Sequence, residues 1–481
     1  MSKLVAVVLL FFITLIPRVY NLQATEIYPD EITWAVRSKE TFYGIKAGNL
    51  FTYSEPWWKT KNDTEAVNLP TTIAGGASMF LLATNQPTNY SLELVPDYIA
   101  PRIASAFLSS IFIVIYYLAI TKLSSRKIAL LASLLFSLDP IHIALSRWFL
   151  PDLYLAFWMF LALSSFMVIK NKTIKTFITA LFVSLAFLTK PTGLLVLAPI
   201  FLMSPIWAIS LGIMSLFIIH FLWLGNEDSI GIEVLKYFQN QAQLAEKPFN
   251  AFFNGKITYD PPWYYYLYVL VVRLPESVLL AIVAIPFIKN LRRYLNKEQL
   301  SLILFTFLYI LVMSLSAKKL GIRYLFPISP WLYFFAATAV IRTIKSRLII
   351  IILILYSVIN VFLYFPNYYL YFNNISGGPN KVQQNYLVAL CQGAKGSIDH
   401  ILSSYKDVTT LAYIGCNYTA VPYYSAIKVV DDWQAQKVVV IEESYKQLHP
   451  NHPAAIFFSN KQPDYVNQFN GVVLSRIYLN H

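Results

Sequence analysis

The sequence predicts an α-helical polytopic membrane protein with a small α/β domain at its C-terminus. Of its 481 residues 57% are hydrophobic and 16% aromatic, whereas only 13% are charged, about half of the share usual in soluble chains. Long apolar runs recur as far as residue 364 and then stop. The net charge is nevertheless +13, and its bases gather in loops between alternate apolar runs. This combination excludes a soluble enzyme and a disordered chain, and it argues against nucleic-acid binding.

Eleven apolar runs predict the membrane part, which we treat as one domain over residues 1–364. The first run, residues 4–16, resembles the apolar region of a signal peptide. No small-x-small cleavage site follows it, so we predict an uncleaved first helix. A long loop over residues 19–97 comes next, with five prolines and a Trp57–Trp58 pair, where we expect interfacial helices. The other runs are 98–121, 128–138, 153–169, 176–188, 193–204, 206–224, 277–288, 300–316, 327–341 and 348–364.

The basic loops predict the orientation of these helices. Four loops between alternate runs, together with the N-terminus, lie on one side of the predicted bundle. Bases in short loops mark the cytoplasmic side. The opposite, extracytoplasmic side then receives the long first loop, residues 139–152, 189–192, 225–276 and 317–326, and the C-terminal tail. The bases are Lys122, Arg126, Lys127, Lys170, Lys172, Lys175, Lys289, Arg292, Arg293, Lys297, Arg342, Lys345 and Arg347.

The tail, residues 365–481, contains no run that could span a membrane. Short β-like stretches at 409–414, 438–441 and 472–477 alternate with helical ones at 382–390 and 398–405, which predicts a small extracytoplasmic α/β domain. The chain has two cysteines, Cys391 and Cys416. They are too few for a disulfide framework or a four-ligand zinc site. An extracytoplasmic tail would permit one disulfide, and two reduced buried thiols are the alternative.

Adjacent acids follow the first helix at the predicted outer edge of the membrane. Asp30 and Glu31 stand directly after Pro29. A carboxylate in this place can remove the proton of an acceptor hydroxyl, as a general base does. The alternative is structural: Asp30 caps a helix that runs to about Lys46, and Glu31 favours the positive end of its dipole.

Two more outward segments carry charges between apolar helices, where charge is costly and often functional. The segment 139–152 contains Arg147 and Asp152, which either belong to a site or form a local ion pair. Its His142 has no second imidazole nearby, so a metal role is not expected. Lys190 ends one helix just before Pro191, where its ammonium would meet an anionic lipid headgroup or extend to the interface.

A third outward segment is basic against the charge rule. It places Lys318, Lys319 and Arg323 within six residues, which suggests an anionic ligand such as phosphate, with a solvated charge run as the alternative. The aromatic stretch 259–266, which contains Trp263 and Tyr264, either holds a sugar ring or polyprenyl chain or belongs to the interfacial belt. The chain has no phosphate-binding P-loop, no glycine-rich dinucleotide fingerprint and no histidine-rich motif. These absences leave an ATPase or a nucleotide-sugar enzyme without support.

Taken in order, these motifs resemble the family 39 glycosyltransferases, which have the C-type membrane fold (GT-C). The family includes protein O-mannosyltransferases and the lipid A aminoarabinose transferase. The resemblance covers most of the chain. Two pieces depart from the pattern: residues 386–393 replace the expected D-W-G-Q, and no clear Lys-Pro-Pro-Leu box lets us assign Lys59 or Lys61. The matching motifs are YPDE, SRWFLPD, FLTKPTG, PPWYYYL, SAKKLGIRYLFPISP and YYLYFNNISGGPN.

The resemblance implies an integral plasma-membrane enzyme that takes a sugar from a polyprenyl-phosphate-linked donor. Transfer to a protein, lipid or glycan acceptor would occur on the extracytoplasmic side. Asp30 would be the catalytic base, with Glu31 as its neighbour. The donor phosphate would meet Lys190, Lys319, Arg323, Arg147 and Tyr324. The substrate would contact Asp152, Trp263 and Tyr264.

A single in-line displacement with inversion fits these residues, because no second carboxylate is required as a nucleophile. Cations on the donor phosphate would stabilise the charge that grows on the leaving group. A divalent cation beside the acidic pair is an open alternative, although no metal-ligand set stands out. Two other functions compete: a transporter or flippase of lipid-linked sugars, for which the expected symmetry between halves is not seen, and a non-catalytic partner in glycan assembly.

Overall fold

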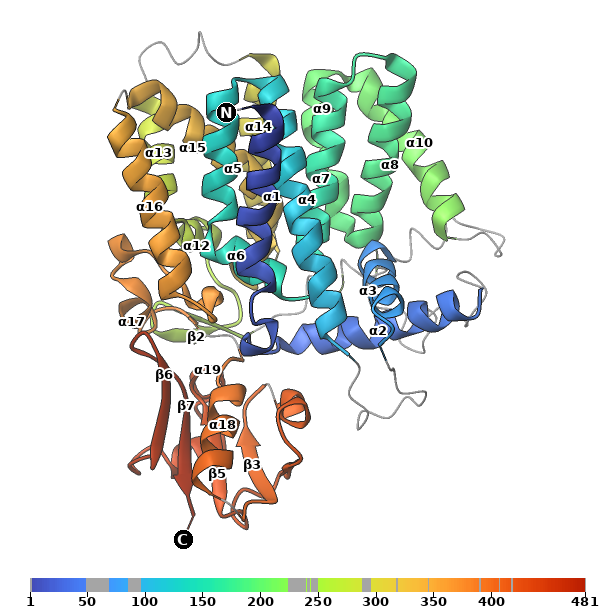
Figure 1. Cartoon of the computed structure of the whole chain (residues 1–481). Helices are drawn as coiled ribbons and strands as arrows, with labels where there is room; N and C mark the ends of the chain where they lie inside the picture. The colour runs from blue at the N-terminus through green and yellow to red at the C-terminus, as the bar shows by residue number, and fades with distance from the viewer. Residues whose placement is uncertain are drawn as a thin grey trace.

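The structure is a computed structural model in which a helical bundle is followed by a small α/β domain (Figure 1). The N-terminus lies near one end of the bundle, and the C-terminal domain lies beyond the other end. The described residues are 2–48, 69–84, 97–223, 239, 243, 250–287, 296–316, 319–344, 346–388, 391–405, 407–416 and 418–480. Trp57, Trp58, Lys59, Lys61 and Lys318 lie outside them.

Each apolar run predicted from the sequence lies on helical structure. Five described helices are long and apolar enough to cross a membrane, or six if the bent pair of α5 and α6 counts as one span. The figure of eleven spans therefore stays a prediction. The helices are α1 (Lys3–Val19), α4 (Ile99–Leu123), α5 (Arg126–Ser137), α7 (Pro151–Val168), α8 (Lys172–Thr189), η3 (Pro191–Val196), α9 (Leu197–Met203), α10 (Pro205–Trp223), α13 (Glu276–Ala284), η4 (Ile285–Phe287), α14 (Lys297–Leu315), α15 (Ser329–Thr343) and α16 (Arg347–Leu363).

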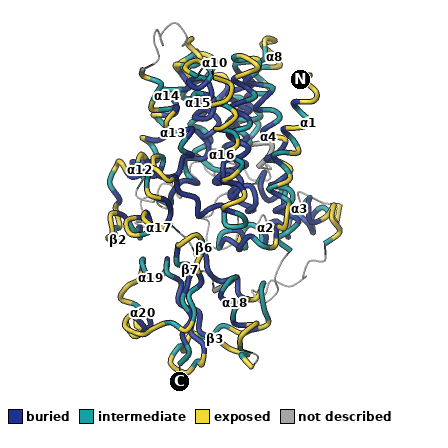
Figure 2. The backbone as a smooth tube through the Cα atoms, turned by 60° about the vertical axis from the view of Figure 1, so that its left-hand side comes forward, coloured by how far each residue is buried: buried dark blue, intermediate teal, exposed yellow. Residues whose placement is uncertain are grey.

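The centre of the bundle is buried along most of its length, and exposed residues collect at its ends and on its outer helices (Figure 2). Trp331, Tyr116 and Phe136 are fully enclosed in one continuous apolar core. Outward-facing side chains of α10 are apolar as well, with Ile206 78% and Phe217 71% exposed. Exposed apolar surface of this kind is typical of a face that meets lipid.

The first loop contributes two helices across the end of the bundle that faces the C-terminal domain (Figure 1). They are α2 (Pro29–Lys46) and α3 (Leu69–Leu81). The predicted helix to Lys46 is thus confirmed, but its N-cap residue is Tyr28, and Asp30 lies one residue inside Pro29. The two helices pack closely because α3 presents Gly76 to α2, where a Cβ atom would lie 2.5 Å from the Thr41 side chain.

The outward segment 139–152 is largely helical, because Asp139 caps a buried helix, α6 (Pro140–Arg147). The helix predicted over 382–390 does not form over its described residues 383–388, so this prediction is wrong: α17 (Gly378–Val382) ends where the helix was expected to begin, and Tyr386 makes a single bridge to Phe253 instead. That bridge places the segment against β1 (Ala251–Phe253), which pairs with β2 (Lys256–Thr258). The helix α12 (Tyr265–Arg273) follows β2 in the chain.

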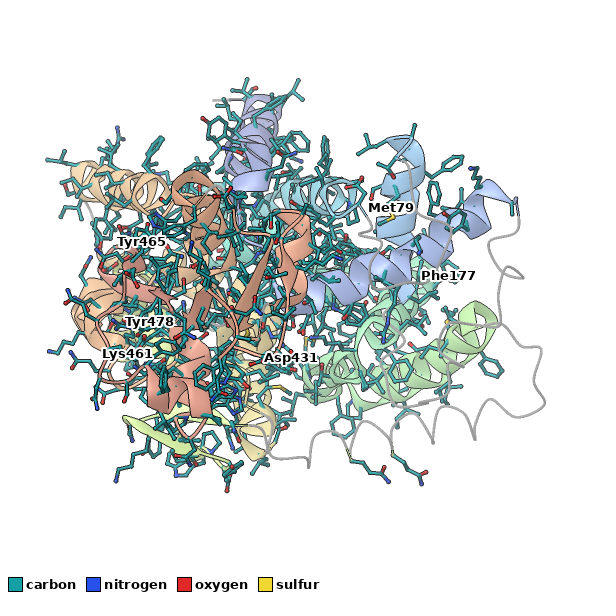
Figure 3. All side chains as sticks on the ribbon, turned by 90° about the horizontal axis from the view of Figure 1, so that it is seen from below. Met79, Phe177, Asp431, Lys461, Tyr465 and Tyr478 are labelled. Carbon is teal, nitrogen blue, oxygen red and sulfur yellow. A yellow bond between two sulfur atoms is a disulfide. The ribbon has the colours of Figure 1, made fainter. Side chains whose placement is uncertain are left out.

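The C-terminal domain contains a mixed five-stranded sheet in the order β4-β3-β5-β7-β6. The three predicted stretches are confirmed as β3 (Thr410–Ile414), β5 (Val438–Glu442) and β7 (Val472–Leu479), and the second predicted helix is α18 (Ala394–Ser404). The remaining elements are β4 (Lys428–Val429), β6 (Tyr465–Phe469), η9 (Tyr418–Tyr423), α19 (Glu443–Leu448) and α20 (Pro453–Phe457). Seen from this end, the domain with its labelled Tyr465 and Tyr478 covers one side of the bundle, and α3 with Met79 lies beside it (Figure 3).

Candidate active site

The site begins at the start of α2, where Asp30 meets a cation from a distant part of the chain. Its Oδ2 lies 2.6 Å from Nη1 of Arg323, and the Asp30 side chain is 48% exposed while that of Arg323 is 8% exposed. Pro29 at the first helical position favours a helix start here, and the positive end of the helix favours an acid in this turn. The result is an accessible carboxylate beside a buried guanidinium.

The neighbouring acid, Glu31, has a different environment. It is fully buried and forms a bidentate pair with Arg102, whose Nε and Nη2 each lie 2.7 Å from one carboxylate oxygen. Two backbone N–H groups, those of Phe149 and Tyr28, also donate to it at 3.0 and 3.3 Å. With its oxygens engaged in this way, Glu31 holds the start of α2 in place. The structure thus separates the two acids into an open one and a clamped one.

Arg323 enters the site from η6 (Ile322–Ile328), directly after a glycine turn. Gly321 has φ +80° and ψ −163°, a conformation that is essentially restricted to glycine. The guanidinium carbon lies 5.2 Å from the ring centre of Tyr28 and 5.4 Å from that of Tyr324. Its buried Nε has no hydrogen-bond partner among the described residues. A buried, unpaired donor on a cation is well suited to an anionic ligand.

Tyr324 connects this group to a second ion pair. Its ring centre lies 5.0 Å from Nζ of Lys190, and that ammonium lies 2.6 Å from Oδ1 of Asp152. The other carboxylate oxygen of Asp152 is buried and has no described partner. Lys190 comes from the end of α8 and Asp152 from the first turn of α7. The structure therefore brings Asp30, Arg323, Tyr324, Lys190 and Asp152 together from four parts of the chain.

Lys319 precedes Arg323 by four residues in the chain. Its side chain is only 3% exposed, yet its nearest carboxylate is Asp260, 3.4 Å away and 88% exposed. Trp263 and Tyr264 follow Asp260 on the same segment and are 69% and 40% exposed. They form no described contact with the Asp30 cluster. Their predicted role in substrate binding stays a prediction.

Arg147 does not join the cluster and does not pair with Asp152. Its guanidinium donates to the backbone oxygens of Pro17, Tyr20 and Asn21 at 2.8 Å and to the Thr25 hydroxyl at 2.6 Å. These bonds hold the chain that links α1 to α2. Of the two alternatives for Arg147 and Asp152, the local ion pair does not form, because backbone oxygens of this turn bind the arginine and Lys190 pairs with the acid. The role of Arg147 at the donor phosphate stays a prediction.

Sequence reasoning missed Tyr28, whose ring faces Arg323, and the structural role of Arg102. Burial raises the pKa of the Tyr28 hydroxyl well above its usual range, against the opposing effect of the Arg323 charge. The hydroxyl therefore stays neutral beside the cation. An aromatic residue directly before the Pro-Asp-Glu sequence was the available signal for Tyr28. For Arg102, the signal was a base on the outer side inside an apolar run.

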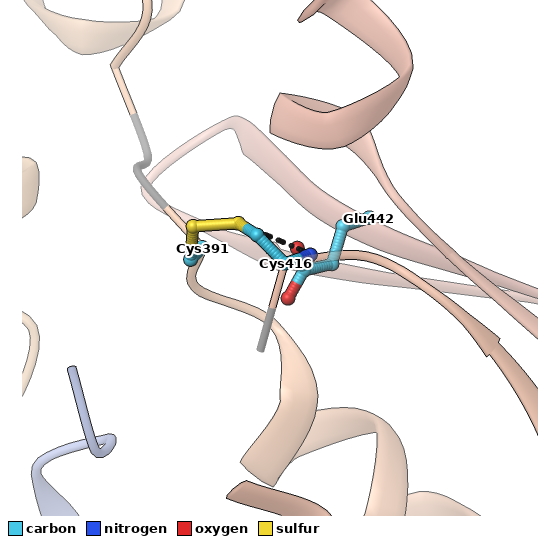
Figure 4. A group of neighbouring side chains, drawn as sticks. All are labelled: Cys391, Cys416 and Glu442. Atoms are coloured by element: carbon cyan, nitrogen blue, oxygen red, sulfur yellow. Dashed lines mark hydrogen bonds between the residues drawn. A yellow bond between two sulfur atoms is a disulfide. The ribbon is translucent and has the colours of Figure 1, made fainter. Parts of the chain in front are cut away.

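The described residues do not fit a divalent cation at the acidic pair, because Glu31 is saturated by Arg102 and Asp30 faces Arg323. A second cluster, Cys391, Cys416 and Glu442, lies in the C-terminal domain. There the two cysteines form a disulfide, and Glu442 accepts a bond from the backbone N–H of Cys416 at 2.9 Å (Figure 4). The disulfide alternative left open by the sequence is the one that the structure contains.

Comparison with known proteins supports the resemblance. The sequence model of the family described as dolichyl-phosphate-mannose-protein mannosyltransferase matches residues 8–224. No curated protein sequence matches the chain. Among solved structures, ArnT from Cupriavidus metallidurans in the apo state aligns with a TM-score of 0.53 at 12% identity, covering 99% of this chain and 97% of that one. The same protein bound to undecaprenyl phosphate aligns with a TM-score of 0.52, with equal identity and coverage.

The apo oligosaccharyltransferase from Archaeoglobus fulgidus is also similar, with a TM-score of 0.50 at 11% identity over 96% of this chain and 72% of that one. At such identities the structural likeness establishes the fold and nothing finer. The family model supplies the independent sequence evidence over the N-terminal part. Together they confirm the resemblance to the family 39 glycosyltransferases and their C-type membrane fold.

Proposed function

We propose that this chain is an integral membrane glycosyltransferase. It moves a sugar, with inversion, from a polyprenyl-phosphate-linked donor to an acceptor hydroxyl on the extracytoplasmic side of the plasma membrane. The observation that carries the proposal is the contact of an accessible carboxylate, Asp30, with a buried guanidinium, Arg323. The Nε of this guanidinium has no hydrogen-bond partner among the described residues. The match to the mannosyltransferase family over residues 8–224 supports the same class of reaction.

The cations would hold the donor phosphate. Arg323 offers its free Nε, and the ammonium of Lys190 lies on the other side of Tyr324. A phosphate bound to Arg323 would compete with Asp30 for the guanidinium and so free the carboxylate for chemistry. Lys319, buried and weakly paired, supplies a third positive charge from the same segment. Undecaprenyl phosphate, the ligand of the similar ArnT structure, is the lipid-phosphate part of such a donor without its sugar.

The proposed transfer forms one bond, breaks one bond and moves one proton. The acceptor oxygen attacks the anomeric carbon and forms the new glycosidic bond, while the bond from that carbon to the phosphate oxygen breaks. The electron pair leaves with polyprenyl phosphate, whose growing charge the cations stabilise. Asp30 takes the proton of the acceptor hydroxyl. No step requires a metal ion, in line with the poor fit of the acidic pair to one.

Two observations support the extracytoplasmic side. The bases at the described helix connections lie at the bundle end that carries the N-terminus, as expected for the cytoplasmic side. The Cys391–Cys416 disulfide lies beyond the other end, and disulfides persist mainly outside the reducing cytoplasm. Asp30 follows the end of α1 that is remote from the N-terminus.

The test is sugar transfer by the purified full chain with the Asp30→Asn substitution. Sugars carried on undecaprenyl phosphate and on dolichyl phosphate serve as labelled donors, with cell membranes as the source of acceptors. We expect transfer to fall by about 10²- to 10⁴-fold, the usual contribution of a general base. Asp399→Asn is the matched control, because Asp399 forms an exposed pair with Lys395 on the far domain.

Unchanged transfer by the Asp30→Asn variant, at normal expression, would exclude Asp30 as the base. Lipid scrambling in proteoliposomes without any transferred sugar would instead favour a flippase. Binding of a partner by the tail, with Asp30 and Arg323 dispensable, would favour a non-catalytic assembly role.

A further inference from the structure

A carboxylate of the membrane part caps a helix of the C-terminal domain. Glu26 is 4% exposed, and its two oxygens accept from the backbone N–H groups of Gly393 at 2.8 Å and Lys395 at 2.9 Å. These groups open α18 (Ala394–Ser404), whose first N–H groups have no partner inside the helix. A carboxylate is a favourable partner there. A side chain before the first interfacial helix thus completes a helix more than 360 positions away in the sequence.

The backbone of the same short segment is held from the membrane side. The carbonyl oxygen of Glu26 accepts from Trp148 Nε1 at 2.8 Å and from Arg102 Nη2 at 3.2 Å. The next N–H, that of Ile27, donates to the hydroxyl of Tyr424 in the C-terminal domain at 2.8 Å. Residues 26–27 are therefore fixed between the two parts of the molecule.

Arg102 links the Glu26 backbone to the acid next to Asp30. The guanidinium that binds the Glu26 carbonyl also forms the bidentate pair with Glu31. Asp30 precedes Glu31 directly, so its position depends on the same clamp. Tyr28 adds a second path, because its ring packs on Trp148 at 4.9 Å and faces Arg323.

The backbone N–H groups that bind Glu26, at the start of α18, are also held in place. Gly393 has φ +129°, and its carbonyl accepts from Ser475 Oγ at 3.0 Å and Asn467 Nδ2 at 3.1 Å. Two residues earlier, Cys391 is tied to Cys416 at the end of β3 (Figure 4). The N–H groups that meet Glu26 are thus held by strands β6 and β7 and by the disulfide.

We propose that Glu26 is a positioning residue through which the C-terminal domain orients the catalytic segment around Asp30. The inference rests on the proposed function for its effect on turnover. It predicts that the domain acts first on the geometry of the base, because the donor-phosphate cations come from other elements, α8 and η6.

The experiment compares Glu26→Ala with the full native chain in two readouts. Hydrogen–deuterium exchange of the peptides covering residues 22–31 and 393–404 should rise together by about tenfold or more, because the shared anchor is lost. Turnover of the labelled polyprenyl-phosphate donor should fall by about 10- to 100-fold, with KM for the donor changed less than about twofold, because uniform donor binding is retained. Glu298→Ala, an exposed Glu in the first turn of α14, is the matched control.

Two further variants separate position from charge. Glu26→Gln keeps the size and one of the two acceptor oxygens but presents an NH2 group to the second N–H donor, so it should restore only part of the turnover that Glu26→Ala loses. Lys395→Ala removes a side chain but keeps the N–H that Glu26 binds, so it should leave both readouts unchanged.

Faster exchange at 393–404 without any change at 22–31 would overturn the proposal, because the cap would then be local to the domain. A loss of turnover without faster exchange at 22–31 would also overturn it in favour of a direct role in the reaction. If the native chain transfers no sugar, the proposed function fails by itself, and the exchange at 22–31 still decides whether the domain holds the Asp30 segment.

Discussion

At the scale of single residues, the acidic pair shows how one step along a helix separates two roles. Successive side chains on an α-helix point about 100° apart, since a turn takes 3.6 residues. Asp30 therefore faces Arg323 and the open side, whereas Glu31 turns inward to Arg102. The sequence predicted that the pair was important and which member would act as base. It could not predict that Glu31 is fully engaged by Arg102, because that partner lies 71 positions away.

This difference predicts opposite phenotypes for the two acids. Glu31→Ala leaves Arg102 as a buried charge without its partner, which should lower the free energy of unfolding by about 3–5 kcal/mol. Asp30→Asn should leave stability nearly unchanged and abolish most transfer. Thermal unfolding of the detergent-solubilised variants, followed by tryptophan fluorescence, measures the first effect. A Glu31→Ala variant that melts like the native chain would show that the clamp is not needed for the fold.

Gly321 gives a second residue-scale prediction. A Cβ atom on it would lie 3.1 Å from the Tyr386 hydroxyl, and its φ of +80° disfavours any other residue. Gly321→Ala should cost about 1–3 kcal/mol and displace η6, so binding of undecaprenyl phosphate should weaken as Arg323 shifts. Gly212→Ala on α10 is the control, since the added methyl meets nothing closer than 3.8 Å. Equal melting temperatures and equal binding for the two variants would contradict this account.

Other contacts at this scale were beyond prediction for a physical reason. Arg147 was expected at the donor phosphate, but backbone oxygens of the α1–α2 connection engage it. Every residue has a backbone oxygen, so no sequence pattern predicts an arginine site made of backbone oxygens. For Lys190 and Arg323 the sequence does predict a partner, because a charge between apolar helices is costly, and their role at the donor phosphate stays a prediction.

At the scale of elements, helices were predictable wherever an apolar run is a property of the local sequence. The failure over 382–390 has a physical cause. Val388 is fully buried and Tyr386 is 3% exposed, yet these side chains are buried by neighbours such as Tyr265 and Arg273, not by a helix of their own. An apolar stretch reports burial, and burial is shared by helices and by irregular segments packed between domains.

The cap of α18 by Glu26 leads to a pH prediction. Burial raises the pKa of this carboxyl from 4.5 to about 7, against the opposing hydrogen bonds from Gly393 and Lys395. A raised pKa means that the folded state binds the proton more tightly than the unfolded state. The stability contributed by Glu26 is therefore fully present below pH 4.5 and is lost as the pH rises through about 7, by up to about 3 kcal/mol.

The measurement is the melting temperature between pH 5 and 8 for the native chain and for Glu26→Gln. The native chain should lose stability relative to the variant as the pH rises. Other titratable or charged groups around Glu26 are Lys395, Arg102, Tyr413 and Tyr424, and none of them is a carboxyl or an imidazole. Parallel pH profiles for the two proteins would assign the titration to another group.

At the scale of the whole molecule, the net charge of +13 is a statement about orientation. In the predicted topology, bases on the N-terminal side account for the excess, whereas bases and acids balance over the rest of the chain. The described members of the first group lie at the connections of α4 with α5, of α7 with α8 and of α15 with α16, and at the start of α14. The charge pattern and the disulfide are the basis of the proposed direction across the membrane.

This direction can be tested by thiol labelling, because the only two native cysteines form the disulfide. Single cysteines are introduced at Thr173, exposed at the start of α8, and at Ser403, exposed on α18. In intact cells a membrane-impermeant maleimide should label Ser403→Cys and should reach Thr173→Cys only after permeabilisation. The reverse pattern would place the Asp30–Arg323 cluster in the cytoplasm. The donor would then have to present its phosphate on the cytoplasmic face, and the disulfide would have to persist in a reducing compartment, so the proposed sidedness would be lost while the chemistry of the cluster could stand.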